Sequence, residues 1–320
     1  MDYAIRFAHP GDPAVMELAT VALPPPGAGE VRVRQTEIGV NFVDIYVRSG
    51  LYPPAALPGG IGAEASGIVE ATGEGVSGFA PGDRVAYAGG PHGSYASARN
   101  LPAARLAKLP DTVSTRVAAA ALLRGMTAYM LLFRVFKASR GQSILIHAAA
   151  GGVGLFLTQW AKRLGLETIG TVGSAAKAET ARAHGLDHAI LHREADFAAE
   201  VRRHAPRGVD FVVDGIGGDG LLKSLSCLAP MGICATIGQA AGTPPPVPVS
   251  ALAGIYLTRP SVLALANDPE AYPTAAAALF AEIAAGLKVE IGAEFPLAEA
   301  AQAHALLASG QSRGSILLKV

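Results

Sequence analysis

An apolar run that ends in a cluster of glycines constrains the fold of this chain more than any other feature. Residues 144–165 read ILIHAAAGGVGLFLTQWAKRLG, so small residues separate an apolar stretch from an amphipathic one. Glycine costs order wherever it sits, so such a cluster indicates either a sharp turn or something pressed against the backbone. The run predicts a buried strand over 143–148, a tight turn, and a helix over 152–164.

The same alternation of strand and helix continues through the middle of the chain. Further strands are predicted at 167–172, 188–191, 209–216 and 232–238, with helices at 175–184, 196–205 and 220–228. Strands that alternate with helices of about ten residues predict a parallel, doubly wound sheet with right-handed crossovers. The middle of the chain therefore has the pattern of an α/β domain.

The N-terminal part has a different pattern, in which short alternating strands are separated by glycine and proline turns. Residues 30–40, 65–76 and 81–89 are examples. Strands at this close spacing predict a compact, antiparallel, barrel-like β domain. The C-terminal part adds predicted helices at 273–285 and 297–308 and then a last strand.

Composition excludes several classes of partner. The 26 basic and 26 acidic side chains cancel, which argues against a nucleic acid or an anionic membrane as the main partner. The two cysteines, Cys227 and Cys234, suit a reducing compartment and cannot build a disulfide framework. Residues 1–13 are charged and broken by proline, and no apolar run reaches the length of a membrane span. We expect a soluble cytoplasmic protein.

The glycine cluster predicts a site for a dinucleotide. Gly151, Gly152 and Gly154 stand at the first turn from strand to helix, although Ala149 replaces the first glycine of the G-x-G-x-x-G pattern. A tight turn with close packing is the plainer alternative. Free backbone N–H groups and the helix dipole at such a turn make a pyrophosphate site, which favours the dinucleotide.

The end of the second strand indicates which dinucleotide. An acid there would hold a ribose 2′-hydroxyl, but the chain has Gly173, Ser174 and Lys177, with no carboxylate before Glu179. A hydroxyl and an ammonium suit a 2′-phosphate, although Lys177 could also be an ordinary solvated residue of a helix. The sequence favours NADPH over NADH.

Neither a metal site nor a hydrolytic triad is indicated. None of the eight histidines shows ligand spacing with a cysteine, and His184 and His188 straddle a predicted helix end. We expect His147 to be a hydrogen-bonded packing residue rather than a catalytic base. No G-x-S-x-G elbow is present either.

Six segments together carry a resemblance to a known family. They are GVNFVDIYVRSGLYP (39–53), GAEASGIV (62–69), GDRVAY (82–87), HAAAGGVG (147–154), GTVGSAAKA (170–178) and YLTRPS (256–261). With them the chain resembles, nearly from end to end, the zinc-independent quinone oxidoreductases of the medium-chain dehydrogenase/reductase superfamily, in the zeta-crystallin-like branch. Zinc-dependent members of the superfamily carry a cysteine in place of Asn41 and a histidine in place of Ala63, and they have a four-cysteine lobe that this chain lacks.

The resemblance implies a domain layout and a cofactor site. It implies a GroES-like catalytic domain of residues 1–124 and 263–320, a Rossmann domain of residues 125–262, and NADPH in the cleft between them. The cofactor-binding residues that it implies are Asn41, Phe42, Tyr46, Thr127, Gly151, Gly152, Val153, Gly173, Ser174, Lys177, His192, Ile216, Gln239, Ser261, Val262 and Arg313. Two of these depart from the family pattern: His192 replaces a tyrosine, and Arg313 lies three residues later than the arginine of some relatives.

The expected activity is transfer of a hydride from NADPH to a quinone or a similar conjugated carbonyl. Asn41, Tyr46 and Tyr52 are the candidate donors to the oxyanion that forms, although tyrosines between such turns often only pack. An NADPH-dependent enone or enoyl-thioester reductase is the alternative enzyme. An NADPH-binding structural or RNA-associated protein is the alternative of another class, and the balanced charge counts against it.

A homodimer is the expected assembly. The resemblance implies it, and residues 260–266 (PSVLALA) are apolar enough to form a further strand at an exposed edge of the Rossmann sheet. Two such edges can pair across a two-fold axis, and proline at Val262 should then weaken the dimer. In the alternative, the proline-rich loop at 242–250 covers the edge and leaves a monomer.

Overall fold

The computed structural model describes residues 1–54 and 56–320, and it divides into two compact units. One unit comprises Met1–Met126 with Val262–Val320, and the other comprises Thr127–Ser261. These bounds lie within two residues of those that the resemblance implies. Each unit is described by itself.

The first unit is built on two β-sheets. The larger sheet has the strand order β15-β16-β3-β5-β6-β8, with β7 also paired to β3, and the smaller has the order β2-β1-β4. All of these strands pair antiparallel except β15 and β16, which run parallel. The strands are β1 (Asp2–Phe7), β2 (Glu17–Val21), β3 (Glu30–Val40), β4 (Gly59–Gly60), β5 (Glu64–Thr72), β6 (Arg84–Ala88), β7 (Ala98–Pro102), β8 (Ala107–Lys108), β15 (Ile291–Pro296) and β16 (Ser315–Lys319).

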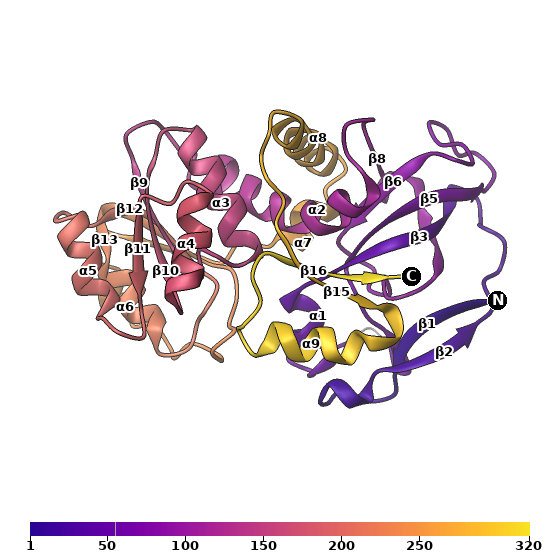
Figure 1. Cartoon of the computed structure of the whole chain (residues 1–320), viewed down its shortest axis with the longest axis horizontal. Coiled ribbons are helices and arrows are strands. Elements are labelled where there is room, and N and C mark those ends of the chain that lie inside the picture. The colour runs from indigo at the N-terminus through magenta and orange to yellow at the C-terminus, as the bar shows by residue number, and fades with distance from the viewer. Residues whose placement is uncertain (55) are drawn as a thin grey trace. The chain divides into compact units, whose positions relative to one another are not determined.

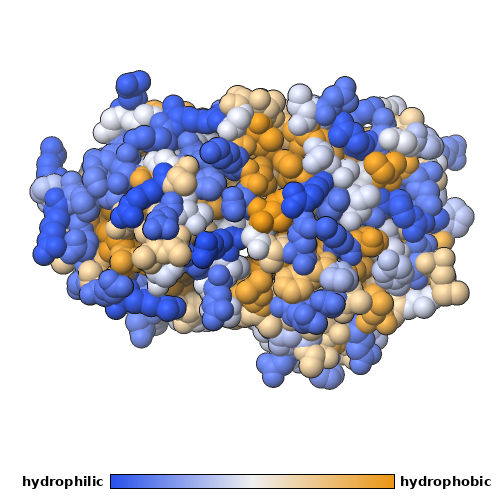
Figure 2. Space-filling model, in the orientation of Figure 1, coloured by the Kyte–Doolittle hydropathy of each residue, from blue (hydrophilic) through white to orange (hydrophobic). Residues whose placement is uncertain are grey.

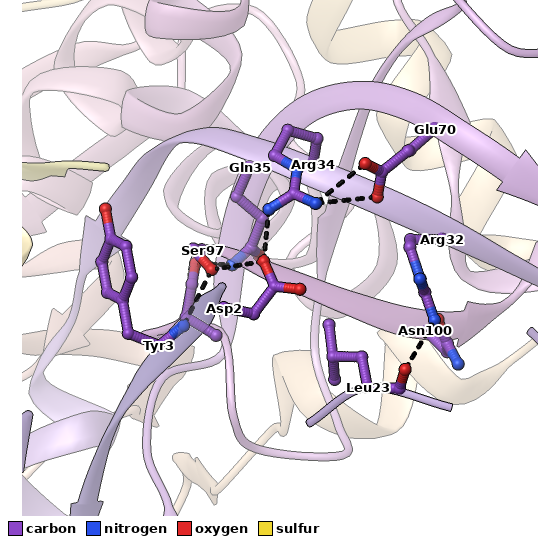
Figure 3. A network of polar contacts seen from close by, with 10 residues as sticks. Asp2, Tyr3, Leu23, Arg32, Arg34, Gln35, Glu70, Ser97 and Asn100 are labelled. Carbon is purple, nitrogen blue, oxygen red and sulfur yellow. Dashed lines mark hydrogen bonds and ion pairs between the residues drawn. The ribbon is translucent and has the colours of Figure 1, made fainter. Parts of the chain in front are cut away.

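An arginine on β3 joins the two sheets of this unit. Figure 3 shows the Arg34 guanidinium between the carboxylates of Asp2 on β1 and Glu70 on β5, and its Nη2 donates to Glu70 Oε1 at 2.8 Å. Ser97 Oγ donates to the same Asp2 carboxylate at 2.9 Å. Burial raises the pKa of Asp2, but the hydrogen bonds from Arg34 and Ser97 outweigh it and hold this pKa below its ordinary value. Because the arginine is exposed, such pairs contribute at most about 1 kcal/mol each to folding.

Helices cover and connect the sheets of the first unit. They are α1 (Phe42–Arg48), α2 (Thr115–Tyr129, which crosses into the second unit at Thr127), α7 (Val262–Asn267), α8 (Ala271–Ala284) and α9 (Ala300–Ala308), with short 3₁₀ turns at Pro13–Val15, Ala103–Arg105 and Leu297–Glu299. The pattern predicted α8 and α9 to within three residues, whereas it did not indicate α1 or α2.

The α2 helix contradicts the expectation that no apolar run reaches the length of a membrane span. It continues into a π-helix, η3 (Met130–Val135), so residues Thr115–Val135 form one helical stretch that is long and apolar enough to cross a membrane. Of the 18 residues in the apolar part of this stretch, 78% are buried inside the protein. A core helix passes this test as readily as a membrane span does, and burial on this scale is what a core helix requires.

The second unit contains the doubly wound parallel sheet that the alternation predicted. Its strand order is β11-β10-β9-β12-β13-β14, and every neighbouring pair runs parallel. Its strands are β9 (Ser143–Ile146), β10 (Glu167–Val172), β11 (His188–Leu191), β12 (Val209–Asp214), β13 (Leu228–Thr236) and β14 (Tyr256–Thr258).

Helices lie on both faces of this parallel sheet. They are α3 (Gly152–Arg163), α4 (Ala175–Ala183), α5 (Phe197–His204) and α6 (Gly220–Ser226), and a 3₁₀ turn follows at Val249–Leu252. Figure 1 shows α3 and α4 on one face of the sheet and α5 and α6 on the other. The outward surface over these helices is mostly hydrophilic in Figure 2, as amphipathic helices on a buried sheet require.

The expected strand at 260–266 was wrong. Residues Val262–Asn267 form α7, and the strand at the sheet edge is instead β14. Pro260 has no backbone N–H for a ladder, and the leucines and alanines that follow are strong helix formers. Val262 is the first residue of a helix, where proline is tolerated, so the proline test suggested by the sequence does not apply.

Candidate functional site

The glycine cluster of the second unit serves both close packing and an open helix terminus. A Cβ at Gly154 would lie 2.3 Å from the Ala148 carbonyl oxygen, so only glycine lets α3 approach β9 this closely. Ala148 itself has a φ of +52°, in the left-handed region that disfavours side chains. The α3 helix then begins at Gly152, which leaves the N–H groups of its first turn available to an anion.

Basic side chains gather where β10 ends. A Cβ at Gly173 would lie 3.6 Å from His192 Nε2 and 3.7 Å from Arg193 Nε, and Ser174 caps α4 by accepting from the Lys177 N–H at 3.4 Å. The pKa of His192 is lowered by burial first and then by the positive charges of Arg193 and Lys177. The structure therefore brings together Gly173, Ser174, Lys177 and His192, as expected, and adds Arg193.

Arg193 was not among the residues predicted from the sequence, although its place in the chain gave a signal. It directly follows His192, which the resemblance had already placed at the cofactor. The residue was missed because the turn after a strand can send either of two neighbouring side chains toward the preceding strand, and only the fold decides between them.

The turn after β12 lies beside the turn after β13. Asp214 Oδ1 accepts the N–H groups of Ile216 and Gly217 at 2.8 and 2.9 Å. Gly217 has a φ of +66°, and a Cβ there would lie 2.9 Å from Gln239 Cα. Ile216 ends one predicted strand and Gln239 directly follows another, and the structure places them in adjacent turns at the carboxyl end of the sheet, where doubly wound sheets bind ligands.

In the first unit, Asn41 is held by a buried ion pair. Its Nδ2 donates to Glu64 Oε2 at 2.9 Å and to the Gly39 carbonyl at 3.3 Å. Arg124 Nη1 lies 3.1 Å from the same Glu64 oxygen, and its Nη2 donates to the Val40 carbonyl. Burial raises the pKa of Glu64, and the charge of Arg124 opposes that rise. The Asn41 amide is thus oriented by partners within its own unit.

A second buried carboxyl holds the first turn of α1. Asp44 Oδ2 accepts the Asn41 N–H at 2.8 Å and the Tyr95 hydroxyl at 3.1 Å. Burial raises the pKa of Asp44 to about 7, against these hydrogen bonds, which lower it. The turn that carries Asn41 and Phe42 is therefore held to the core of the unit through Asp44 and Tyr95.

Three aromatic residues lie together beside this turn. The Tyr46 and Tyr52 rings are 5.2 Å apart, edge to face at 62°, and Phe42 lies 6.2 Å from Tyr46. The Tyr52 N–H donates to the Tyr46 carbonyl at 2.9 Å. The structure thus brings together Phe42, Tyr46 and Tyr52, which the sequence had placed in one segment.

The remaining predicted residues lie at the borders of the units. Thr127 and Ser261 are the first and last residues of the second unit, and Val262 begins α7 in the first. Arg313 lies away from these borders: it is exposed in the first unit, two residues before β16. Their contacts with a cofactor stay predictions.

The donor set around Asn41 does not suit zinc. An asparagine amide and the Ala63 methyl group stand where zinc-dependent relatives have thiolate and imidazole, and the Glu64 carboxylate is already paired with a guanidinium. Among residues 1–54 and 56–320, no group of three or more histidine, cysteine, aspartate or glutamate side chains could hold a metal ion. Cys227 and Cys234 are buried, and burial raises the pKa of both thiols, to about 11 for Cys227.

Comparisons with known proteins identify two family models and several relatives that cover nearly the whole chain. Residues 27–111 match the model of the alcohol dehydrogenase GroES-like domain, and residues 152–282 match that of the zinc-binding dehydrogenases. The chain is 43% identical to a quinone oxidoreductase of Pseudomonas aeruginosa over 98% of both chains. It is 41% identical to a 2-haloacrylate reductase of a Burkholderia species over 92% of this chain and 91% of that one. The crystal structure of Escherichia coli quinone oxidoreductase complexed with NADPH matches with a TM-score of 0.96 at 39% identity, over 99% of this chain and 100% of that one.

Proposed function

Since the chain belongs to the quinone oxidoreductases of the medium-chain dehydrogenase/reductase superfamily, we propose that it transfers a hydride from NADPH to a quinone or a similar conjugated carbonyl. The observation that carries the cofactor assignment is the group of basic side chains around Gly173. His192 and Arg193 lie beside Gly173, and the charge of Lys177 acts on His192, at the position where an acid would select the unphosphorylated ribose. The related quinone oxidoreductase of Escherichia coli was crystallised in complex with NADPH.

The cofactor site that we propose comprises the residues named from the resemblance together with Arg193. The N–H groups at the start of α3 suit the pyrophosphate, and the basic side chains after β10 suit the 2′-phosphate. The turns that carry Ile216 and Gln239 would hold the ribose and nicotinamide.

The bound nicotinamide supplies the hydride, so the residues of the chain orient the acceptor and stabilise the charge that develops on its oxygen. We assign the donor role to Tyr46 and Tyr52, whose rings lie edge to face beside α1. The Asn41 amide does not suit the donor role expected of it, because its N–H groups are directed to Glu64 and the Gly39 carbonyl. We assign Asn41 the role of positioning this turn instead.

The acceptor is tested by steady-state oxidation of NADPH with a panel of quinones, enones and enoyl thioesters. We expect the highest kcat/KM with quinones. The likeness to a 2-haloacrylate reductase supports enone reduction as the second candidate, which preferential turnover of the enones would favour. Binding of NADPH without turnover of any acceptor would instead support a structural or RNA-associated role.

We propose that this reaction needs no metal. The Asn41, Ala63 and Glu64 positions cannot assemble a zinc ligand set, so dialysis against a strong chelator is expected to leave kcat and the thermal midpoint unchanged. Metal analysis of the purified protein is the second measurement. Zinc at one equivalent per chain, with loss of activity on chelation, would contradict the proposal.

We also propose a soluble, cytoplasmic homodimer that pairs through the edge of the parallel sheet. The β14 strand forms that edge, and Tyr256 on it is 51% exposed. An uncovered strand edge pairs readily with its symmetry mate. In light scattering coupled to gel filtration at micromolar concentration we expect the mass of two chains, and Tyr256→Lys should shift it toward one because like charges then meet across the axis. A single-chain mass for the unmodified protein would rule out the dimer.

A further inference from the structure

Side chains from three neighbouring strands and one helix form a hydrogen-bonded chain at the carboxyl end of the parallel sheet. His147, directly after β9, lies with Nδ1 2.9 Å from Thr171 Oγ1 on β10 and with Nε2 3.0 Å from Ser224 Oγ on α6. Ser224 Oγ also donates to Asp214 Oδ2, at the end of β12, at 2.8 Å. The chain therefore spans β10, β9 and β12, which are adjacent in the sheet.

The chemistry of the four groups determines the direction of the hydrogen bonds. The Ser224 hydroxyl has one hydrogen, which it can give to Asp214 Oδ2 at 2.8 Å or to the Gly220 carbonyl at 3.1 Å. Both of these groups only accept, so the Ser224 oxygen accepts from the Nε2–H of His147. His147 Nδ1 then carries no hydrogen and accepts from the Thr171 hydroxyl. Burial lowers the pKa of His147, although the charge of Asp214 opposes this, so a neutral ring agrees with the hydrogen-bond pattern.

The histidine ring is also held in place by packing. Phe197 lies against it edge to face, with ring centroids 4.9 Å apart at 82°. The Lys223 ammonium lies 4.8 Å above the Phe197 ring and 2.9 Å from Asp196 Oδ1. The ring therefore has little freedom to leave its two partners.

Members of the network contact or adjoin the backbone of the turns that follow these strands. Asp214 uses its other oxygen to accept the N–H groups of Ile216 and Gly217, whose turn continues in the left-handed region. His147 directly precedes the strained Ala148 that opens the glycine turn into α3. Thr171 stands two residues before Gly173. The turns after β9, β10 and β12, three of the four assigned above to NADPH, are thus each tied to one member of the network.

We propose that His147, Ser224 and Asp214 are positioning residues that hold these three NADPH-binding turns in register through one hydrogen-bonded chain. Asp214 and Ser224 are each 1% exposed and Thr171 is 3% exposed, so these side chains act through the backbone rather than by touching the cofactor. The serine, histidine and aspartate do not form a hydrolytic triad, because the Ser224 hydroxyl gives its hydrogen to the carboxylate or to the Gly220 carbonyl and is buried. The inference rests on the proposed function for the identity of the ligand.

The same strands offer a matched control at their opposite end. Ser143 at the start of β9 donates from Oγ to Asp210 Oδ2 on β12 at 2.9 Å. Ser143→Ala therefore removes a serine–aspartate hydrogen bond between β9 and β12, two of the strands that the network spans, but at their amino end and away from the three turns.

The test compares NADPH binding by Ser224→Ala, Thr171→Val and Ser143→Ala, measured by calorimetry. We expect the first two to raise the Kd for NADPH about tenfold, the order that loss of a buried hydrogen bond gives, with kcat at saturating NADPH within about twofold of the unmodified protein. Ser143→Ala should lower the thermal midpoint and leave the Kd unchanged.

A second measurement needs no ligand. Hydrogen exchange at the Ile216 and Gly217 amides should accelerate in Ser224→Ala and not in Ser143→Ala. If Ser224→Ala does not fold, Thr171→Val decides the question. Unchanged Kd and exchange in the variants that fold would overturn the proposal, as would an equal rise in Kd for Ser143→Ala. Failure of the unmodified protein to bind NADPH would overturn the proposed function. Hydrogen exchange at the Ile216 and Gly217 amides would then still test whether the network holds the turns.

Discussion

Replacing Lys177 with alanine is expected to raise the KM for NADPH about ten- to a hundredfold and to leave the KM for NADH nearly unchanged. A charge-assisted contact to the 2′-phosphate contributes roughly 1.5–3 kcal/mol to binding. NADH has no 2′-phosphate and makes no such contact, so its binding is not weakened. Arg193→Ala should act in the same direction, because its guanidinium lies next to the same turn at Gly173. Steady-state kinetics with both cofactors measures the effect.

A lysine elsewhere on the same unit provides the control. Lys162 on α3 pairs with Asp187, and Lys162→Ala removes the same charge without approaching the turn after β10. It should leave both KM values unchanged. If the unmodified protein uses NADPH and NADH with equal KM values, the basic side chains around Gly173 do not select the phosphate.

The second large effect is expected from Arg124→Met, which should lower the free energy of unfolding by about 3–5 kcal/mol. Glu64 is fully buried and Arg124 is 5% exposed, so the substitution leaves a carboxylate in the core without its cation. The Val40 carbonyl loses a donor as well. Chemical denaturation at neutral pH measures the loss.

The double variant Glu64→Gln with Arg124→Met separates the charge from the packing. It should be more stable than Arg124→Met alone, because no buried charge then lacks a partner. If the double variant is no more stable, loss of packing rather than the unpaired charge explains the effect.

The pH dependence of Arg124→Met follows from the same carboxyl. Burial already raises the pKa of Glu64, and without the opposing guanidinium this pKa should rise further. The folded state then binds a proton more tightly than the unfolded chain, so stability falls as pH rises from the ordinary glutamate pKa to the folded-state pKa. We therefore expect Arg124→Met to lose less stability at about pH 5 than at about pH 8, measured against the unmodified protein.

Much of the cofactor site follows from local patterns in the sequence. The strand, glycine turn and helix at 143–164 and the absence of an acid after the second strand depend on neighbours within one supersecondary unit. Patterns of this kind determine the hydrophobic period, the turn and the residues beside it, and the structure places α3 and α4 as they predict.

The strand expected at 260–266 shows where a local pattern fails. A short apolar run can form a strand or a helix, and its partners decide which of the two it becomes. Here Leu265 and Ala266 are buried in α7, beside α8, and the sheet edge passes to β14 instead.

The sequence by itself predicted the two kinds of domain, the dinucleotide turn and NADPH as the cofactor, because each prediction depends on residues close together along the chain. Only the tertiary structure decided that Arg193 lies beside Gly173, that Arg124 and Glu64 hold the Asn41 amide, and that His147 meets Ser224. These contacts join residues 20 to 77 positions apart, and no local period encodes which distant side chains meet. The order of the strands and the packing of the helices bring them together, and that order follows from burial of the whole core.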